Sequence, residues 1–183
     1  YRVLPRIMDI HPDQPRADED LVVYGSGFVP YDGNTFVIIK ALNNEKKLHD
    51  VWVRPTAIDS SLTQITVRLP LGLVSSNIYV NTAYPGADKE YQDKSNQLKY
   101  QVKPVISRVV WSQRGFDQVG DKTQIYGKGI AGGPTVNYYD RNGKEIEKVK
   151  GTFLRIDGSN EIIEAPSSKK ANTYSVTVTA AGI

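Results

Sequence analysis

The feature that most constrains this chain is a stretch of sequence that occurs twice. Residues 1–7, Tyr-Arg-Val-Leu-Pro-Arg-Ile, return as residues 100–106, Tyr-Gln-Val-Lys-Pro-Val-Ile. Three more landmarks recur in the same order at nearly the same spacing: 23–28 as 125–130, 65–70 as 161–166, and 78–81 as 174–177. Ordered self-similarity of this kind indicates repeated folding units. We therefore expect two modules, over residues 1–102 and 103–183.

Apolar and polar residues alternate within each copy. Ile65, Val67 and Leu69, for example, alternate with Thr66 and Arg68. A period of two places apolar side chains on one face of a strand, so that one face of the sheet is buried. Tyr, Val, Ile and Thr are plentiful, and Gly and Pro separate the alternating stretches. The chain is therefore predicted to be all-β, with two sheets packed face to face in each module.

Specific positions follow from this pattern. Asn142-Gly143 lies between two strand-like stretches and predicts a hairpin with a type I′ turn. The glycine pairs at 25–27 and 127–129 are followed by neither a third glycine nor a helix, so they are interpreted as turns rather than as a dinucleotide loop. The predicted core residues are Phe28, Val67 and Val80 in the first module and Ile130, Ile163 and Val176 in the second.

These landmarks resemble the IPT/TIG family, whose modules occur in plexins, in Rel-type transcription factors and in many bacterial surface and carbohydrate-active proteins. The family's opening Pro-x-Ile corresponds to residues 5–7 and 104–106, and its Gly-x-Gly before an apolar residue corresponds to residues 25–28 and 127–130. A second proline matches His11-Pro12 in the first copy, but Trp111-Ser112 stands there in the second. The resemblance implies two tandem immunoglobulin-like (E-set type) β-sandwiches.

Residues suited to catalysis are scarce. The chain has no cysteine, and its two histidines, His11 and His49, lie in different segments. The acidic run at 18–20 lacks the alternate spacing of a calcium loop, so a solvated loop is the favoured interpretation. No nucleophile elbow, phosphate loop or zinc-protease motif is present. We expect no enzymatic activity, no cofactor and no bound metal.

Aromatic residues are the remaining candidates for a binding site. Trp52 is opposite in phase to Val51 and Val53, so if the two valines face the core, its ring faces solvent or a neighbour. Tyr79, Tyr84 and Tyr91 lie on or beside a long polar excursion over residues 84–96. Exposed rings beside Asn, Asp and Lys suit a sugar or a protein surface. The alternative is a decorated hairpin whose tyrosines pack on the neighbouring module.

We weigh three functions from these observations. The first is a structural or adhesive module pair of a multidomain extracellular or cell-surface protein, whose partners are proteins, surface glycans and neighbouring repeats. The second is a carbohydrate-binding accessory module of a secreted glycan-active protein. The third, DNA binding in the Rel manner, is disfavoured because the net charge of +3 is not gathered into a basic patch. No apolar run is long enough to insert as a membrane helix.

The ends of the two copies differ. Residues 97–102 form a closing strand-like stretch in the first copy, but only residues 180–183 follow the corresponding place in the second. Residues 1–4 in turn look like the tail of a closing strand from a preceding module. We expect the second module to lack its last strand, which either a continuing chain or another chain would supply. The boundary is expected at residues 102–104, with a short and stiff linker.

Overall fold

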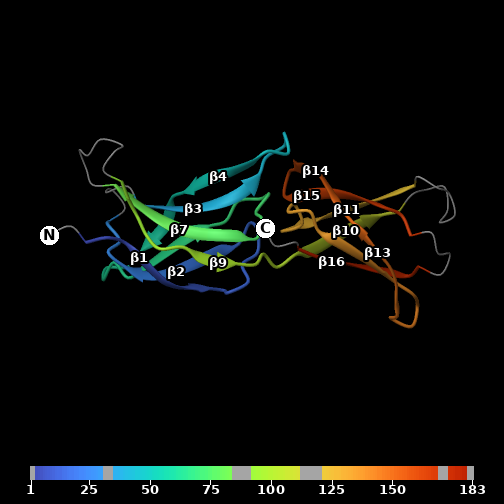
Figure 1. Cartoon of the computed structure of the whole chain (residues 1–183), viewed down its shortest axis with the longest axis horizontal. Coiled ribbons are helices and arrows are strands. Elements are labelled where there is room, and N and C mark those ends of the chain that lie inside the picture. The colour runs from blue at the N-terminus through green and yellow to red at the C-terminus, as the bar shows by residue number, and fades with distance from the viewer. Residues whose placement is uncertain (1–2, 31–34, 84–91, 112–120, 169–172, 181–183) are drawn as a thin grey trace.

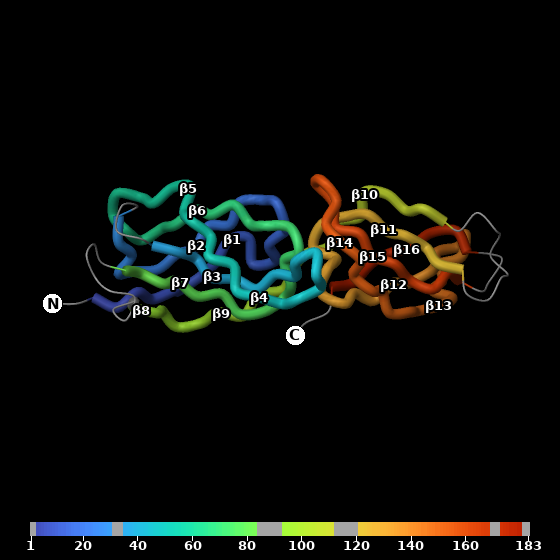
Figure 2. The backbone as a smooth tube through the Cα atoms, turned by 90° about the horizontal axis from the view of Figure 1, so that it is seen from above, coloured from blue at the N-terminus to red at the C-terminus, as the bar shows by residue number. Residues whose placement is uncertain are grey.

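The structure is a computed structural model that describes residues 3–30, 35–83, 92–111, 121–168 and 173–180. These residues form β-strands and no helix, which confirms the all-β prediction. Two groups of strands lie end to end along the long axis of the molecule (Figures 1 and 2). Strands β1–β9 form the group that we call the first half, and β10–β16 form the second half.

The first half contains two antiparallel sheets. One has the order β1-β2-β6-β5, and the other has the order β4-β3-β7-β8, with the short strand β9 also paired to β7. The strands are β1 (Arg6–His11), β2 (Asp20–Ser26), β3 (Thr35–Leu42), β4 (Leu48–Val53), β5 (Pro55–Ile58), β6 (Gln64–Arg68), β7 (Ser76–Ala83), β8 (Gln92–Lys94) and β9 (Leu98–Tyr100). Both sheets contribute to one buried apolar cluster, as in a β-sandwich.

The second half repeats this arrangement. Its sheets have the orders β10-β11-β15-β14 and β13-β12-β16. The strands are β10 (Val105–Val110), β11 (Lys122–Lys128), β12 (Thr135–Tyr139), β13 (Glu145–Lys150), β14 (Thr152–Asp157), β15 (Asn160–Pro166) and β16 (Ser175–Thr179). A second apolar cluster lies between them. Strand for strand, the order matches the first half, except that β16 pairs with β12 alone among the described strands.

The two halves share local geometry where the sequence repeats. β1 and β2 pair with a bulge after Ile7, and β10 and β11 pair with the same bulge after Ile106. A Cβ at Gly127 would lie 2.1 Å from the Val105 carbonyl oxygen, so only glycine fits beside this strand. Gly129 has a φ of 68° and returns Ile130 to the core. The second glycine of each pair, Gly27 or Gly129, has a positive φ and makes a turn as predicted, whereas the first, Gly25 or Gly127, lies within a strand.

Five of the six predicted core residues are fully buried, and Val176 is the exception. Val176 is only half-buried opposite Tyr138, while Val178, opposite Val136, is the buried valine of β16. The sequence repeat that aligns residues 78–81 with 174–177 is two residues out of register with the structure. The same shift occurs in β15, because Ile163 pairs with Ile125 of β11 in the way that Ile65 of β6 pairs with Val23 of β2. A slip by two leaves every side chain on its original face, so alternation does not reveal it.

The predicted turn type at Asn142-Gly143 is wrong, although the hairpin is present. A type I′ turn needs positive φ at both central residues, but of this pair only Gly143 has one, at 77°. The Asp140 carboxylate accepts hydrogen bonds from the amides of Asn142 and Lys144, and the Gly143 amide donates to the Asp140 carbonyl. This side chain stabilises a longer loop that ends on a left-handed glycine.

Candidate functional site

The outer face of the sheet β4-β3-β7-β8 brings two of the predicted site residues together. Ile38 pairs with Trp52 on one side and with Tyr79 on the other. The Trp52 side chain is 46% exposed, as its phase predicted. Ile38 is not part of the inner apolar cluster, yet it is 0% exposed. Large side chains directly opposite in a sheet are within contact distance, so the two flanking rings cover Ile38.

A third ring extends this surface. Phe36 meets Trp52 edge to face, with 5.6 Å between the ring centroids and an interplanar angle of 69°. We call Phe36, Trp52 and Tyr79 the aromatic face. Cations lie over it: the Arg54 guanidinium is 5.6 Å from the Phe36 ring, and the Lys94 ammonium is 5.1 Å from the Tyr79 ring. Such contacts hold a ring in place and give its surroundings a positive character.

Polar groups lie next to the Tyr79 ring. The Lys40 ammonium contacts the Asp50 carboxylate at 2.8 Å, and the Asn77 amide donates to the Gln97 side chain at 3.0 Å. Partial burial, and then the nearby Asp50 carboxylate, raise the pKa of Tyr79. These groups line a shallow hollow of about 190 Å³. Fixed donors and acceptors beside a ring suit a hydroxyl-rich or peptide ligand.

The other two predicted residues cannot be placed here. Tyr84 and Tyr91 lie outside the described residues, so their part in a binding site stays a prediction. Phe36 and Lys94 are the residues that sequence reasoning missed. Phe36 is two residues from Ile38 in the same alternating stretch, so its phase could have identified it once the strand pairing was known.

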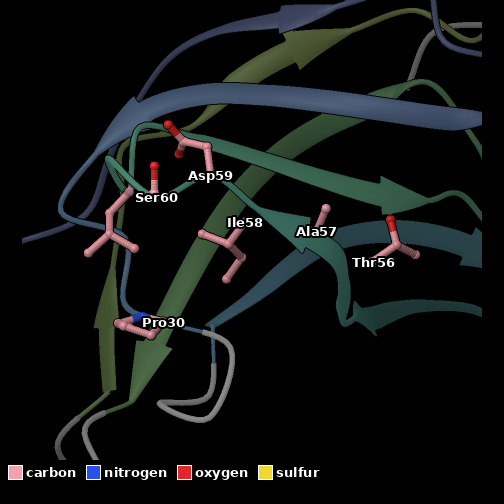
Figure 3. Close-up of a pocket in the computed structure, with 7 residues that line it drawn as sticks. Pro30, Thr56, Ala57, Ile58, Asp59 and Ser60 are labelled. Carbon is pink, nitrogen blue, oxygen red and sulfur yellow. The ribbon is translucent and has the colours of Figure 1, made fainter.

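A larger hollow, of about 420 Å³, lies between Pro30 and the hairpin of β5 and β6. Ile58 lines it, while Asp59 directs its carboxylate away from Pro30 (Figure 3). That carboxylate accepts hydrogen bonds from the Ser61 hydroxyl and from the amides of Thr63 and Gln64. These bonds, the Ser61 bond first, lower the pKa of Asp59 to about 2. The group stabilises a turn as a carboxylate, and it is unsuited to proton transfer near neutral pH.

A buried carboxylate joins the two halves. Glu161 on β15 is 0% exposed, and it accepts hydrogen bonds from the amides of Ile130 and Ala131 at 2.6 and 2.9 Å. Its other oxygen accepts from the Gly72 amide of the first half at 2.8 Å. Burial raises the pKa of Glu161, and the amide bonds, led by that of Gly72, oppose the rise. One side chain therefore ties a loop of the first half to the core of the second.

Further contacts surround this carboxylate. Lys128 of the second half donates to Asp18 at 2.6 Å, and Arg68 contacts the same carboxylate at 3.3 Å. The Ile156 amide donates to the Asn44 side chain at 2.6 Å. Leu42 packs on the second apolar cluster. Of the acidic run at residues 18–20, Asp18 thus serves the junction, while Glu19 and Asp20 pair with arginines of the first half. The described residues hold no group of three metal-ligating side chains.

Comparisons with known proteins identify no family. No family model matches the chain, and no curated protein matches it either. Among solved structures, it is similar to an auxiliary nutrient binding protein from Bacteroides thetaiotaomicron, with a TM-score of 0.40, 11% identity and coverage of 92% of this chain and 39% of the other. It is also similar to a candidate phosphatase from the same organism (TM-score 0.37, 12% identity, 97% and 34% coverage).

A tetra-tandem repeat from the extending region of a large adhesion protein matches with a TM-score of 0.25 and 10% identity, over 88% of this chain and 44% of the repeat structure. The chain spans less than half the length of each of these three structures. At scores this low, the likenesses carry no argument about function. The described part of the chain contains no helix that could span a bilayer.

Proposed function

We propose that the chain is a non-catalytic pair of structural or adhesive modules from a multidomain surface or extracellular protein. Each half would be an immunoglobulin-like module of the E-set type that resembles the IPT/TIG family. The sheet orders support this: β1-β2-β6-β5 corresponds to strands A, B, E and D of an immunoglobulin fold, and β4-β3-β7-β9 corresponds to C′, C, F and G. The division of the buried apolar residues into two clusters, with Val102 in the first, supports a module boundary near residues 102–104.

The observation that carries the proposal is the junction. Three polar links of different kinds cross it, through Glu161, Lys128 and Asn44. Val102 belongs to the first apolar cluster, and its side chain also fills the space above Gly129 of the second half. Neighbouring domains without a substantial interface move relative to one another. Contacts of this number favour one fixed orientation, which suits a spacer that presents surfaces at a set distance.

Residual dipolar couplings of the whole chain in an aligning medium test this proposal. We expect one alignment tensor to fit the amides of both halves. Two tensors of clearly different magnitude would overturn the proposal of a fixed pair. Glu161→Ala is the matched perturbation, because it removes the buried link without changing the aromatic face, and it should separate the two tensors.

The aromatic face favours a second candidate function, a carbohydrate-binding accessory module. Rings beside fixed polar groups recognise the apolar faces and hydroxyls of sugars. Retention by immobilised soluble polysaccharides in native gel electrophoresis would test it. Trp52→Ala and Tyr79→Ala should each abolish retention, while Tyr24→Ala, a change of an exposed ring on β2, should leave it intact. Retention that survives both changes to the aromatic face would rule out this site.

A further inference from the structure

The two halves differ in one place that their shared topology makes conspicuous. In the first half, β9 pairs antiparallel with β7, with Ser76 opposite Tyr100 and Ile78 opposite Leu98. In the second half, β16 occupies the place of β7. It has β12 on one side and no described strand on the other, where β9 lies in the first half. The N–H and C=O groups of alternate residues along that side point away from β12, as at any sheet edge.

The segment around β9 closes the open side of the first half. Leu98, Tyr100 and Val102 all pack in the first apolar cluster. The segment also bridges the two sheets. Ser95 donates its amide to the Val80 carbonyl of β7, and the Asn96 side chain both accepts from the Ile7 amide and donates to the Ile7 carbonyl of β1, at 2.8 and 2.9 Å.

The burial of β1 shows what this cover achieves. Ile7 and Ile10 on β1 are 1% and 6% exposed. Ile106 and Val109 occupy the same places on β10, with the same bulge, but both are only half-buried. No side chain in the described ranges makes to Ile106 the pair of bonds that Asn96 makes to Ile7.

β10 and β16 are neighbours, and each therefore carries incompletely covered apolar side chains. We call Ile106, Val109 and Val176 the seam, and all three pack on the second apolar cluster while keeping part of their surface exposed. An unpaired strand edge beside exposed apolar groups is the combination that binds an added β-strand. The edge supplies main-chain hydrogen bonds, and the seam selects side chains at alternate positions of the bound segment.

We propose that the seam binds an extended peptide strand, antiparallel to β16, with the chemistry of residues 95–102. Such a strand carries an asparagine whose side chain would bond both the amide and the carbonyl of Ile106 at the bulge. An aliphatic, an aromatic and a β-branched residue follow it at alternate positions. The occupant is identified by the first half itself, where a strand of this chemistry fills the corresponding place. This inference concerns a different surface from the aromatic face, and it does not depend on the function proposed above.

The test is a titration of the whole chain with a synthetic peptide of residues 95–104, followed by amide hydrogen exchange. At a peptide concentration about ten times its Kd, exchange in β16 should slow about tenfold, because the bound state no longer opens. A peptide with Asn96→Ala, Tyr100→Ser and Val102→Ser should not bind. In the chain, Val176→Lys should abolish the effect, while Val110→Lys, an exposed change on β10, should preserve it.

Several results would overturn the proposal. These are an absence of binding, equal binding of the triply substituted peptide, or protection that appears in β7 rather than β16, which would mean exchange with the native β9. Residues 1–3 share the Tyr-x-Val of residues 100–102. Concentration-dependent self-association that removal of residues 1–4 abolishes, without peptide binding, would identify a second copy as the occupant. Unchanged exchange in β11 and β15 serves as the control that Val176→Lys still folds.

Discussion

Replacement of Glu161 tests how strongly the two halves are coupled. Glu161→Ala leaves the amides of Gly72, Ile130 and Ala131 without their acceptor. Each unsatisfied buried donor costs about 1–3 kcal/mol. Water that enters the vacated space recovers part of this, and the cost of burying the charge disappears. We therefore expect the free energy of unfolding to fall by about 1–3 kcal/mol or more, the cost of at least one buried donor that stays unsatisfied.

Glu161→Gln separates the two ends of this link. A glutamine has one acceptor oxygen, and it satisfies most donors when that oxygen faces Ile130 and Ala131. Its NH₂ group then faces the Gly72 amide, so the hydrogen bond between the halves is lost while the bonds within the second half remain. Amide exchange should therefore accelerate at Gly72 but not at Ile130.

Urea denaturation and amide exchange check both variants. Glu164→Ala is the matched control on the same strand, because its carboxylate pairs with Lys122 at the surface, and such pairs contribute less than about 1 kcal/mol. The reasoning is refuted if Glu161→Ala costs no more than Glu164→Ala. It is also refuted if Gly72 stays as protected in Glu161→Gln as in the natural sequence.

Three more changes are predictable from the structure. Gly127→Ala places a Cβ 2.1 Å from the Val105 carbonyl and should lower the free energy of unfolding by about 1–3 kcal/mol or more in thermal melts, and an unchanged melting temperature would contradict this. Ile163→Ala should cost about 2–5 kcal/mol, and a cost below 1 kcal/mol would show that the core tolerates the cavity. The hydrogen bond and charge of Lys128 lower the pKa of Asp18 below its ordinary 3.8, so the stability contributed by Asp18 is present above that value and is lost as the pH falls through the lowered pKa. Asp18→Asn should accordingly flatten the pH dependence of the urea midpoint in acid, and an identical profile in the variant would show that other groups cause it.

The sequence predicts the strand content of this chain better than its pairing. The close approach of Gly25 to β1 and of Gly127 to β10 was not predicted, because both glycine pairs were interpreted as turns. Alternation identified the faces of β6 and β15. It did not set the register between the copies, because a shift by two residues preserves every inward position. The half-burial of Val176 follows from the neighbours of β16, which no local pattern encodes.

The candidate sites were predicted in part. The phase of Trp52 predicted its exposure, but only the register of β3 shows that Trp52 and Tyr79 flank one residue. Glu161 could not be identified from sequence, because an acidic residue in an alternating strand ordinarily faces solvent. Its partners lie 30, 31 and 89 residues away along the chain, so the three donors are gathered only by the fold.

The residues that lead into each half have a geometric consequence for longer chains. Val3 and Leu4 lie against Gly27 in the same way that Val102 and Lys103 lie against Gly129. The approach to the first half therefore copies the approach to the second. If further repeats joined through this contact, each would be related to the next by the same rotation and translation. Repetition of one such operator generates a screw axis, so an array of these units would form a helical rod whose pitch is determined by the geometry of one junction.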